Sequence, residues 1–439
     1  MSGRRGSCPT LATPMATGDG LLARLKPISG GMIPATLAGI AEAARRFGNG
    51  LIEVTARGSL QIRGLTRDSA PRFAAAVDAL DIPVRSGVPV ETGPLAGLDP
   101  EEIKDPRPFA QDIRERIAAA GLSQRLGPKV SVVVDGGGRL KLDALVADVR
   151  LVATGGAWRV AIGGTATAGL WALIPEADAA ATVVAILETV AAKGRRARAN
   201  ELSLEELRSP LPPSVLLDIS PSRGEIGRTE GGNGERSPIS TFPLSDARVA
   251  FGIGLPFGQT TAERIISFAE AAERHGVDEI RPAPGRALLA LVPSAEAAGP
   301  LKHIAGTLGF ITDATDPRLS VVACAGAPAC ASGHIQARAI ASEIAADAAA
   351  ILGDGQLLHV SGCAKQCAKP AGAAFTLVGT ATGAELHAGD GVAGEPIARV
   401  ANNAAAAAFR RAGERRRQEK NTGDNVAGAA TAQAGEMTR

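Results

Sequence analysis

A helix followed by a two-stranded hairpin is predicted near the amino-terminal end of the chain. Apolar residues recur every three or four positions from Ile33 to Phe47, which is the spacing of one helix face, and Gly48 can end that helix. Apolar and polar residues then alternate over residues 51–63, as they do in a strand with one buried face. The parity continues through Gly58, which indicates a hairpin with an odd loop near residues 57–59.

The alternation divides this hairpin into two faces. The predicted core face carries Ile52, Val54, Ala56, Leu60 and Ile62. The opposite face is polar and carries Glu53, Thr55, Arg57, Ser59, Gln61 and Arg63. Because alternate residues of a strand point to the same side, we expect the polar set to form one continuous surface.

The helix and hairpin return later in the chain. The sequence AEAARRFG begins at Ala41 and AEAAERHG begins at Ala269, so the offset is 228 residues, and the same offset aligns Gly30 with Gly258. This self-similarity predicts an internal duplication in which each helix–hairpin unit is followed by a larger α/β module. The second copy lacks the polar face, because Gly285, Leu289 and Leu291 stand where the first copy has Arg57, Gln61 and Arg63.

Two segments lack apolar periodicity. Residues 195–245 are rich in Pro, Gly, Ser and charge and are predicted to form a flexible linker. Residues 403–439 are predicted to be a largely disordered tail, with the basic run RRAGERRRQEK on a solvated helix end.

Composition narrows the class of protein. The chain has 439 residues, of which 45% are apolar and 21% charged, so several globular domains are expected. The net charge of +2, with 3% aromatic residues and no Tyr, argues against a nucleic-acid partner. No apolar run is long enough for a membrane span and no secretory signal is apparent, so a cytoplasmic protein without a membrane partner is expected.

Four of the five cysteines fall in two pairs. Cys324 and Cys330 have five residues between them, and Cys363 and Cys367 have three; each pair follows an apolar stretch predicted to be a buried strand. Small neighbours allow the backbone to approach a cofactor closely, and four thiolates from two strand ends can hold a [4Fe–4S] cluster. Structural zinc and inert thiols are the alternatives. The fifth, Cys8, is expected to be a free thiol without function.

The C-x5-C and C-x3-C pairs resemble the cluster motif of the sirohaem-dependent sulfite and nitrite reductases. VTARGSLQIRGL and PLAGLDP resemble the tetrapyrrole-binding hairpin of those enzymes and the segment that follows it. Within this superfamily, CPTLATPMATGDGLLARL and PAPGRALLALV are most similar to the precorrin-3B synthases, and the resemblance extends from Cys8 to about Val400.

The resemblance implies an α+β fold in which two ferredoxin-like half-domains pair and two larger sulfite-reductase-type α/β domains accompany them. The expected segments are a first half-domain at 8–105, a first reductase-type α/β domain at 106–194, the linker at 195–245, a second half-domain at 246–314, a cluster-binding α/β domain at 315–402 and the tail at 403–439.

The resemblance also implies a basic set around the carboxylates of a bound tetrapyrrole. The positions that match it are Arg57, Gln61, Arg63, Arg85, Lys129 and Arg286. Ser131 replaces the second Lys of the reductases' Lys-x-Lys pair, which weakens a sulfite or nitrite reductase assignment. Asp19 and Arg24 are weaker candidates, because the Gly-Asp-Gly around Asp19 also fits a turn.

The activity that the resemblance implies is an oxygen-dependent monooxygenation of precorrin-3A, with closure of a ring-A acetate lactone. Electrons would reach the cluster from an external NAD(P)H-linked reductase or ferredoxin-type donor, because FGIGLPFG at 251–258 is only a near miss to a dinucleotide fingerprint. The alternatives are a sirohaem-dependent sulfite or nitrite reductase, and a non-enzymatic electron-transfer or tetrapyrrole-binding protein.

The family also implies a non-haem iron, and this sequence does not assign its ligands. The candidates are His275, His303, His334, His359 and His387. His275 is expected to be structural, because it stands at a helix end where the first copy has Phe47. No catalytic residue is identified by its pattern.

Overall fold

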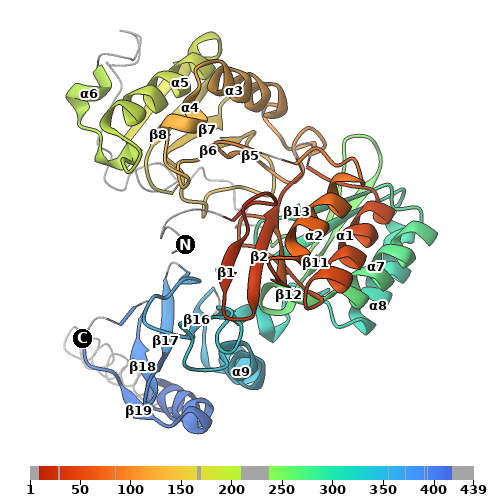
Figure 1. Cartoon of the computed structure of the whole chain (residues 1–439), viewed down its shortest axis with the longest axis vertical. Coiled ribbons are helices and arrows are strands. Elements are labelled where there is room, and N and C mark those ends of the chain that lie inside the picture. The colour runs from red at the N-terminus through yellow and green to blue at the C-terminus, as the bar shows by residue number, and fades with distance from the viewer. Residues whose placement is uncertain are drawn as a thin grey trace, which may run out of the picture. The chain divides into compact units, whose positions relative to one another are not determined.

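The structure, a computed structural model, divides the chain into two compact units (Figure 1). It describes residues 9–27, 30–84, 86–165, 170–208, 237–353, 355–370, 372–389, 391–392 and 394–417. The first unit holds residues up to Met15 and Leu21–Thr312, and the second holds Ala16–Gly20 and the residues from Asp313 onward. The finer division expected from the sequence stays a prediction. Within the described ranges, no helix combines the length and apolar character that a membrane crossing requires.

The first copy forms the helix and hairpin expected from its periodicity. Helix α1 (Pro34–Phe47) is followed by β3 (Leu51–Val54) and β4 (Leu60–Leu65), with Ile52 opposite Ile62. Strands β1 (Met15–Thr17) and β2 (Gly20–Leu25) precede it, and α2 (Ser69–Asp78) follows. The sheet has the order β1-β2-β4-β3-β12.

The second copy repeats this arrangement. It contains β11 (Val249–Gly254), β12 (Gln259–Thr261), α7 (Ala262–Arg274), β13 (Glu279–Ala283), β14 (Ala287–Val292) and α8 (Ala295–Thr307). With β10 (Thr241–Pro243) it forms a sheet of order β10-β11-β14-β13.

The two copies exchange short extended segments. Thr260 of β12 pairs with Ile52 of β3, and Met32 forms the equivalent bridge to Ile280 of β13. Subtracting the offset of 228 from Thr260 and Ile280 gives Met32 and Ile52, so the two pairings are the same contact seen from each copy. The geometry therefore confirms the predicted duplication as an approximate two-fold arrangement.

The pairing continues at the helices and at the hairpin tips. Helices α1 and α7 pack side by side (Figure 1), and both contribute to one shared core. Arg57 bridges Pro284, and the Gly285 amide donates to Ala56 O at 3.1 Å. This tip contact explains why the expectation for Ala56 is wrong: its side chain is exposed, because the loop turns toward the other copy instead of continuing the strand.

Each copy is followed by an α/β module with the same strand order. In the first, β5 (Val90–Thr92), β6 (Val132–Asp135) and β7 (Val149–Ala153) are parallel, and β8 (Ala157–Ile162) and β9 (Leu170–Pro175) are antiparallel to their neighbours. The helices of this module are α3 (Arg107–Ala119), α4 (Leu122–Arg125) and α5 (Glu176–Lys193). Its core contains the edge-to-face pair Phe109 and Trp158.

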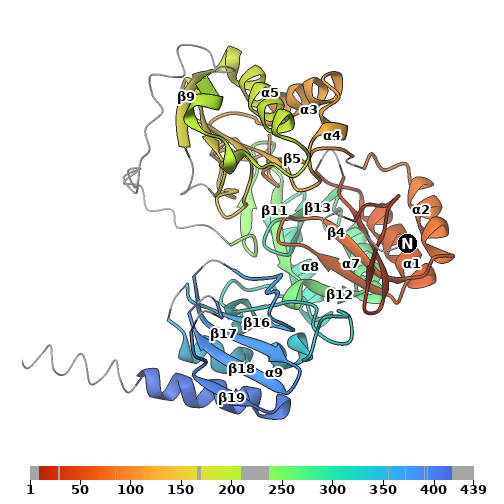
Figure 2. The same cartoon turned by 60° about the vertical axis from the view of Figure 1, so that its left-hand side comes forward.

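The second unit repeats that topology. Strands β15 (Val321–Ala323), β16 (Leu357–Ser361) and β17 (Ala373–Thr380) are parallel, and β18 (Gly383–Ala388) and β19 (Ala398–Val400) follow antiparallel. Helix α9 (Ala337–Ile351) contacts β15 and β16, and Figure 2 shows β16, β17 and β18 side by side. Both copies therefore contain the larger α/β module that was predicted to follow each helix–hairpin unit.

The predicted linker and tail differ in part from the structure. A 3-10 turn (Ala199–Glu201), α6 (Leu204–Arg208) and β10 lie within the range expected to be a linker. Residues 405–417 are helical, because a stripe of small residues and Phe409 packs onto the sheet, with Phe409 edge-to-face on Phe375. Residues 209–236 and 418–439 lie outside the described ranges.

The contact between the hairpin tips predicts unequal effects of two glycine substitutions. Gly58 and Gly50 both have a positive φ, of 71° and 74°. A Cβ on Gly58 would lie 2.8 Å from Ala283 C, whereas one on Gly50 would meet nothing within 4 Å. We expect Gly50→Ala to destabilise by about 1–2 kcal/mol from backbone strain alone, and Gly58→Ala by about 1–3 kcal/mol more from overpacking. Thermal unfolding measures both; equal losses would contradict a tight contact at the tips.

Candidate functional site: four thiols and a polar sheet face

The two cysteine pairs lie at the same edge of the sheet in the second unit. Cys324 follows β15 directly, and Cys363 follows β16 after Gly362. Because β15 and β16 are parallel neighbours, their carboxyl ends lie side by side. The Cys324 amide donates to Val360 O at 3.1 Å, and the Gly362 amide donates to Cys324 Sγ at 3.0 Å. An amide aimed at a thiolate stabilises its negative charge.

Glycines allow the loops that carry the thiols to pack backbone against backbone. A Cβ on Gly362 would lie 2.9 Å from Gly326 Cα and 3.4 Å from Cys324 Sγ. A Cβ on Gly333 would lie 2.6 Å from Ala327 N. Larger residues at these positions would fill the space around the thiols, so the small neighbours noted in the sequence are required by close approach.

The other three thiols act electrostatically on Cys367. Burial raises the pKa of the Cys367 thiol, and the negative charges of Cys363, Cys324 and Cys330 raise it further, while Lys365 opposes them. All four cysteines are free, Cys363 is buried and Cys367 is exposed. Like charges that oppose one another's ionisation are relieved when a cation binds among them.

The two ligand chemistries open to four thiols are an iron–sulfur cluster and a single metal ion. Among the residues with described positions, no group of three or more His, Cys, Asp or Glu side chains could hold one metal ion. Structural zinc takes all its ligands at one centre, whereas an iron–sulfur cube takes one cysteine at each of four corners. Cys8 lies outside the described residues.

A polar network covers the face of β2, β4 and β3 opposite the shared core. Gln61 accepts from Arg24 Nε at 3.0 Å and donates to Glu53 Oε2 at 2.7 Å. Arg63 places a guanidinium nitrogen 3.5 Å from the same Glu53 oxygen, and Gln259 of β12 lies 3.5 Å from the other. Glu53, Gln61 and Arg63 are 5%, 9% and 3% exposed, so most of this network is already satisfied within the protein.

Arg57 lies apart from that network, on the hairpin loop. Its guanidinium donates to Val146 O, and its own carbonyl accepts from Lys26 Nζ at 2.8 Å. Lys26 also pairs with Glu91 at 2.5 Å. The loop is therefore held from both sides while the Arg57 side chain stays partly exposed. Of the three hairpin residues expected on one face, Gln61 and Arg63 both contact Glu53, whereas the printed contact of the Arg57 side chain is with Val146 O.

The remaining predicted contacts have different surroundings. Lys129 is exposed, in the turn before β6, and Arg85 lies outside the described residues. Arg286 occupies the β13–β14 turn with φ 64°, and a Cβ on Gly258 would lie 2.6 Å from its Cδ. Asp19 accepts from Thr17 Oγ1 at 2.8 Å, as expected of a turn residue. Ser131 is 3% exposed, and its amide donates to Asp148, which also pairs with Arg198 at 2.8 Å.

The second copy buries the equivalent face, with two leucines packed in an apolar cluster and Arg281, at the position of Glu53, donating to Pro94 O at 3.1 Å. Leu289 and Leu291 are fully buried in a cluster with Leu95, Phe242 and Leu244. The segment that holds Leu95 is fixed by a buried pair in which Arg139 Nε lies 2.7 Å from Asp99 Oδ1. The leucines that replace Gln61 and Arg63 are therefore core residues, whereas a single working face stays a prediction.

Comparisons with known proteins place this arrangement in a family. Residues 13–80 match the nitrite/sulfite reductase ferredoxin-like half domain. A precorrin-3B synthase from Sinorhizobium sp is 38% identical over 406 residues, which cover 91% of this chain and 86% of the relative. The chain belongs to the precorrin-3B synthase family.

More distant relatives of this precorrin-3B synthase family member fit the same superfamily. A ferredoxin–nitrite reductase from Synechococcus elongatus is 26% identical over 394 residues, covering 82% of this chain and 76% of that protein. The structure of the Mycobacterium tuberculosis NirA protein aligns with a TM-score of 0.69 at 18% identity, covering 88% of this chain and 79% of that one. This likeness supports the sulfite- and nitrite-reductase-type fold.

Sequence reasoning missed two polar residues of the candidate site in this family member. Gln259 joins the first sheet only because β12 is exchanged, and its counterpart at the offset of 228 is Gly31, which carries no polar side chain. Lys26 directly follows β2, and no alternation of apolar and polar residues there indicated that it belongs to the site. A search for residues flanking each repeated helix would have found Gln259.

The histidines do not assemble a second metal centre in the described part of the chain. His275 Nδ1 lies 2.8 Å from Ala271 O and caps α7, which fits the structural role expected for it. His359 and His387 are buried and both lie opposite Thr376, on either side of it in the sheet. The His334 amide donates to Gly362 O at 2.7 Å, so this residue contacts the cysteine loops through its backbone.

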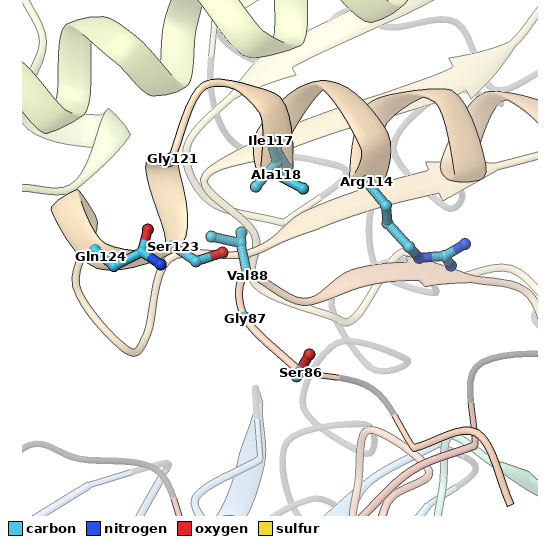
Figure 3. A pocket seen from close by; sticks show the side chains of 9 residues that line it. All are labelled: Ser86, Gly87, Val88, Arg114, Ile117, Ala118, Gly121, Ser123 and Gln124. Carbon is cyan, nitrogen blue, oxygen red and sulfur yellow. The ribbon is translucent and has the colours of Figure 1, made fainter.

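A cavity of about 370 Å³ lies in the first α/β module (Figure 3). It is bounded by α3, α4 and the segment before β5, and its polar side chains include Arg114, which donates to Val90 O at 3.0 Å. Its volume is near the lower limit for small-molecule pockets. None of the described residues that line the cavity is among the site residues expected from the sequence.

The thiol assignment predicts that Cys363→Ser removes cluster iron. Serine keeps the size of the side chain but supplies a poor ligand for iron, and metal binding stabilises the fold that holds it. We expect iron and acid-labile sulfide per chain to fall by more than half, together with the unfolding temperature. Cys8→Ser, which lies outside the two motifs, serves as the control and should change neither quantity. Unchanged iron in Cys363→Ser would contradict the assignment.

Proposed function

We propose that this protein is a precorrin-3B synthase, an oxygen-dependent monooxygenase that hydroxylates precorrin-3A while the ring-A acetate closes to a lactone. The observation that carries the proposal is the 38% identity to a precorrin-3B synthase across 91% of the chain. The single polar sheet face is consistent with one substrate site in a duplicated protein, because the other face is buried under Leu289 and Leu291.

The reaction balances as a monooxygenation. One oxygen atom of O2 enters the product, and the other leaves as water after taking up two electrons and two protons. The acetate carboxyl group of ring A adds to the carbon next to the hydroxylated one, so the π bond between these two carbons is replaced by the new carbon–hydroxyl and lactone carbon–oxygen bonds, and the acid proton balances the proton of the hydroxyl. The electrons come from an external NAD(P)H-linked reductase or ferredoxin-type donor, because the FGIGLPFG segment forms β11 and a turn into β12 with Phe257 at φ 51°, not a phosphate-binding helix start.

Cys324, Cys330, Cys363 and Cys367 would hold a [4Fe–4S] cluster, which supplies single electrons to the substrate site when bound. The chain itself contributes the amide of Gly362 to the Cys324 thiolate and the close packing of Gly326 and Gly333 around it. A non-haem iron does not fit the described side chains, since none of them form a group that could hold one ion, so no step is assigned to it. The four cysteines of the two motifs form no disulfide, which supports a location of the protein in the reducing cytoplasm.

The substrate's carboxylates would be bound by the partly exposed cations. Arg57 and Arg24 offer planar guanidinium groups, which bind carboxylates with paired hydrogen bonds. Gln61 orients Arg24, and Arg63 balances the charge of Glu53, so these two act by shaping the surface. Lys129 and Arg286 provide further positive charge, and Arg85 completes the set expected from the sequence.

The proposed function is tested by the visible absorption spectrum of the protein together with the product it forms from precorrin-3A. Anaerobically purified protein should show broad cluster absorption without the strong bands of sirohaem. With precorrin-3A, a reductant and 18O-labelled O2, we expect a product heavier by one labelled oxygen atom. Sirohaem bands with reduction of sulfite or nitrite would favour the reductase alternative. A cluster spectrum without product would leave a non-enzymatic tetrapyrrole-binding or electron-transfer protein.

Replacing Arg57 tests the substrate face. Arg57→Ala removes one charge-assisted contact, worth about 1.5–3 kcal/mol, so Kd for precorrin-3A should rise by about ten- to a hundred-fold. The matched control is Arg45→Ala, because Arg45 is an exposed arginine paired with Glu42 on α1. Equal Kd values in the two variants would show that Arg57 does not contact the substrate. The measurement is fluorescence or absorption titration under anaerobic conditions.

A further inference from the structure

The turn between β1 and β2 packs directly on the loop that carries Cys330. Residues 16–20 belong to the same compact unit as the cysteine loops, although the rest of β2 belongs to the other. The Gly18 amide donates to Ala329 O at 3.2 Å. A segment far from the cysteines in sequence therefore forms one wall of the loop next to a predicted cluster ligand.

Only glycine fits at this contact. A Cβ on Gly18 would lie 2.5 Å from Pro328 O, 2.7 Å from Ala331 N and 2.8 Å from the carbonyl carbon of Cys330. All three are backbone atoms, so no flexible side chain can move aside. Any larger residue must displace either the turn or the Cys330 peptide.

The Cys330 loop has no room to retreat on its other side. The Cys330 amide donates to Gly326 O at 2.7 Å, and Cys330 O accepts from Gly333 at 2.8 Å. Behind it, a Cβ on Gly326 would lie 2.5 Å from Ala337 N, the first residue of α9. The loop is therefore held between the β1–β2 turn and the start of α9.

The turn is itself fixed by a side chain. Thr17 Oγ1 donates to Asp19 Oδ1 at 2.8 Å and lies 2.9 Å from Gly20 O. This local bonding is typical of Ser/Thr and Asx turns. Because these bonds hold the turn rigid, the turn fixes the position of the Cys330 peptide that packs on it.

We propose that Gly18 is a positioning residue for Cys330: by close backbone packing, it sets where that thiolate meets the cluster. The inference rests on the proposed function in that it takes the four thiols to hold a [4Fe–4S] cluster. It assigns a role in the cluster site to the Gly-Asp-Gly segment, which otherwise serves only as a turn.

The test compares Gly18→Ala with Gly353→Ala in the full-length protein reconstituted with iron and sulfide. Gly353 is in the same unit, and a Cβ there would meet nothing within 4 Å. We expect Gly18→Ala to hold at most half the cluster of the wild type, and its remaining cluster to show a shifted midpoint potential and altered g values in the reduced state. Gly353→Ala should match the wild type in all three.

Thr17→Val separates a positioning effect from failure to fold, because it removes the hydroxyl without adding bulk. We expect a smaller shift of the same potential, with circular dichroism unchanged. If Gly18→Ala does not fold, Thr17→Val provides the test, because a midpoint potential and spectrum equal to those of the wild type would overturn the inference. If the wild-type protein binds no cluster, the cluster assignment itself is refuted. If the wild type and Gly18→Ala both bind a full cluster with the same potential and spectrum, only the role of Gly18 is refuted.

Discussion

The exchange of short segments between the two copies is the constraint on which the first unit depends. Strand β3 has no neighbour on its outer side except β12, and β13 is completed in the same way by the chain around Met32. Backbone groups at an open sheet edge need partners, and here each copy supplies them to the other. The shared core beneath α1 and α7 then follows, because the two sheets are held in one orientation.

That arrangement also explains how a symmetric backbone carries an asymmetric surface. On one sheet, Arg24, Gln61 and Glu53 form a polar network that includes Gln259 from the other copy. On the other sheet, Leu289 and Leu291 are covered by the segment around Leu95 and by Phe242. Equivalent strand positions thus carry a polar network in one copy and apolar packing in the other, and their side chains make the difference.

Much of the fold could be predicted from the sequence, because hydrophobic periodicity and internal repetition can both be read directly along the chain. The alternation from Ile52 to Ile62 and the offset between Ala41 and Ala269 gave the hairpin and the duplication. The exposure of Ala56 could not be predicted, since it depends on contact with Gly285 of the other copy. The packed helix at 405–417 was not predicted, because the basic run indicated a solvated tail although Phe409 lies on an apolar face.

The candidate site was predicted less completely. The cysteine pairs could be found from their spacing, but the ion pair of Arg63 with Glu53 depends on two adjacent strands and could not. Gln259 and Gly18 reach their sites through long-range packing that no spacing reveals. Patterns along a chain report which residues share a face, whereas the partner of each charge is decided by tertiary contacts.

The exchanged strand has a consequence for synthesis. Thr260 leaves the ribosome about two hundred residues after Ile52, its partner in the sheet, and at 5–20 residues per second this interval is roughly 10–40 s. Throughout that time the nascent first copy presents an open strand edge, which is a template for pairing with other chains. Slow translation or crowded polysomes should therefore favour swapping between neighbouring nascent chains, and holdase chaperones should protect this protein before its second copy emerges.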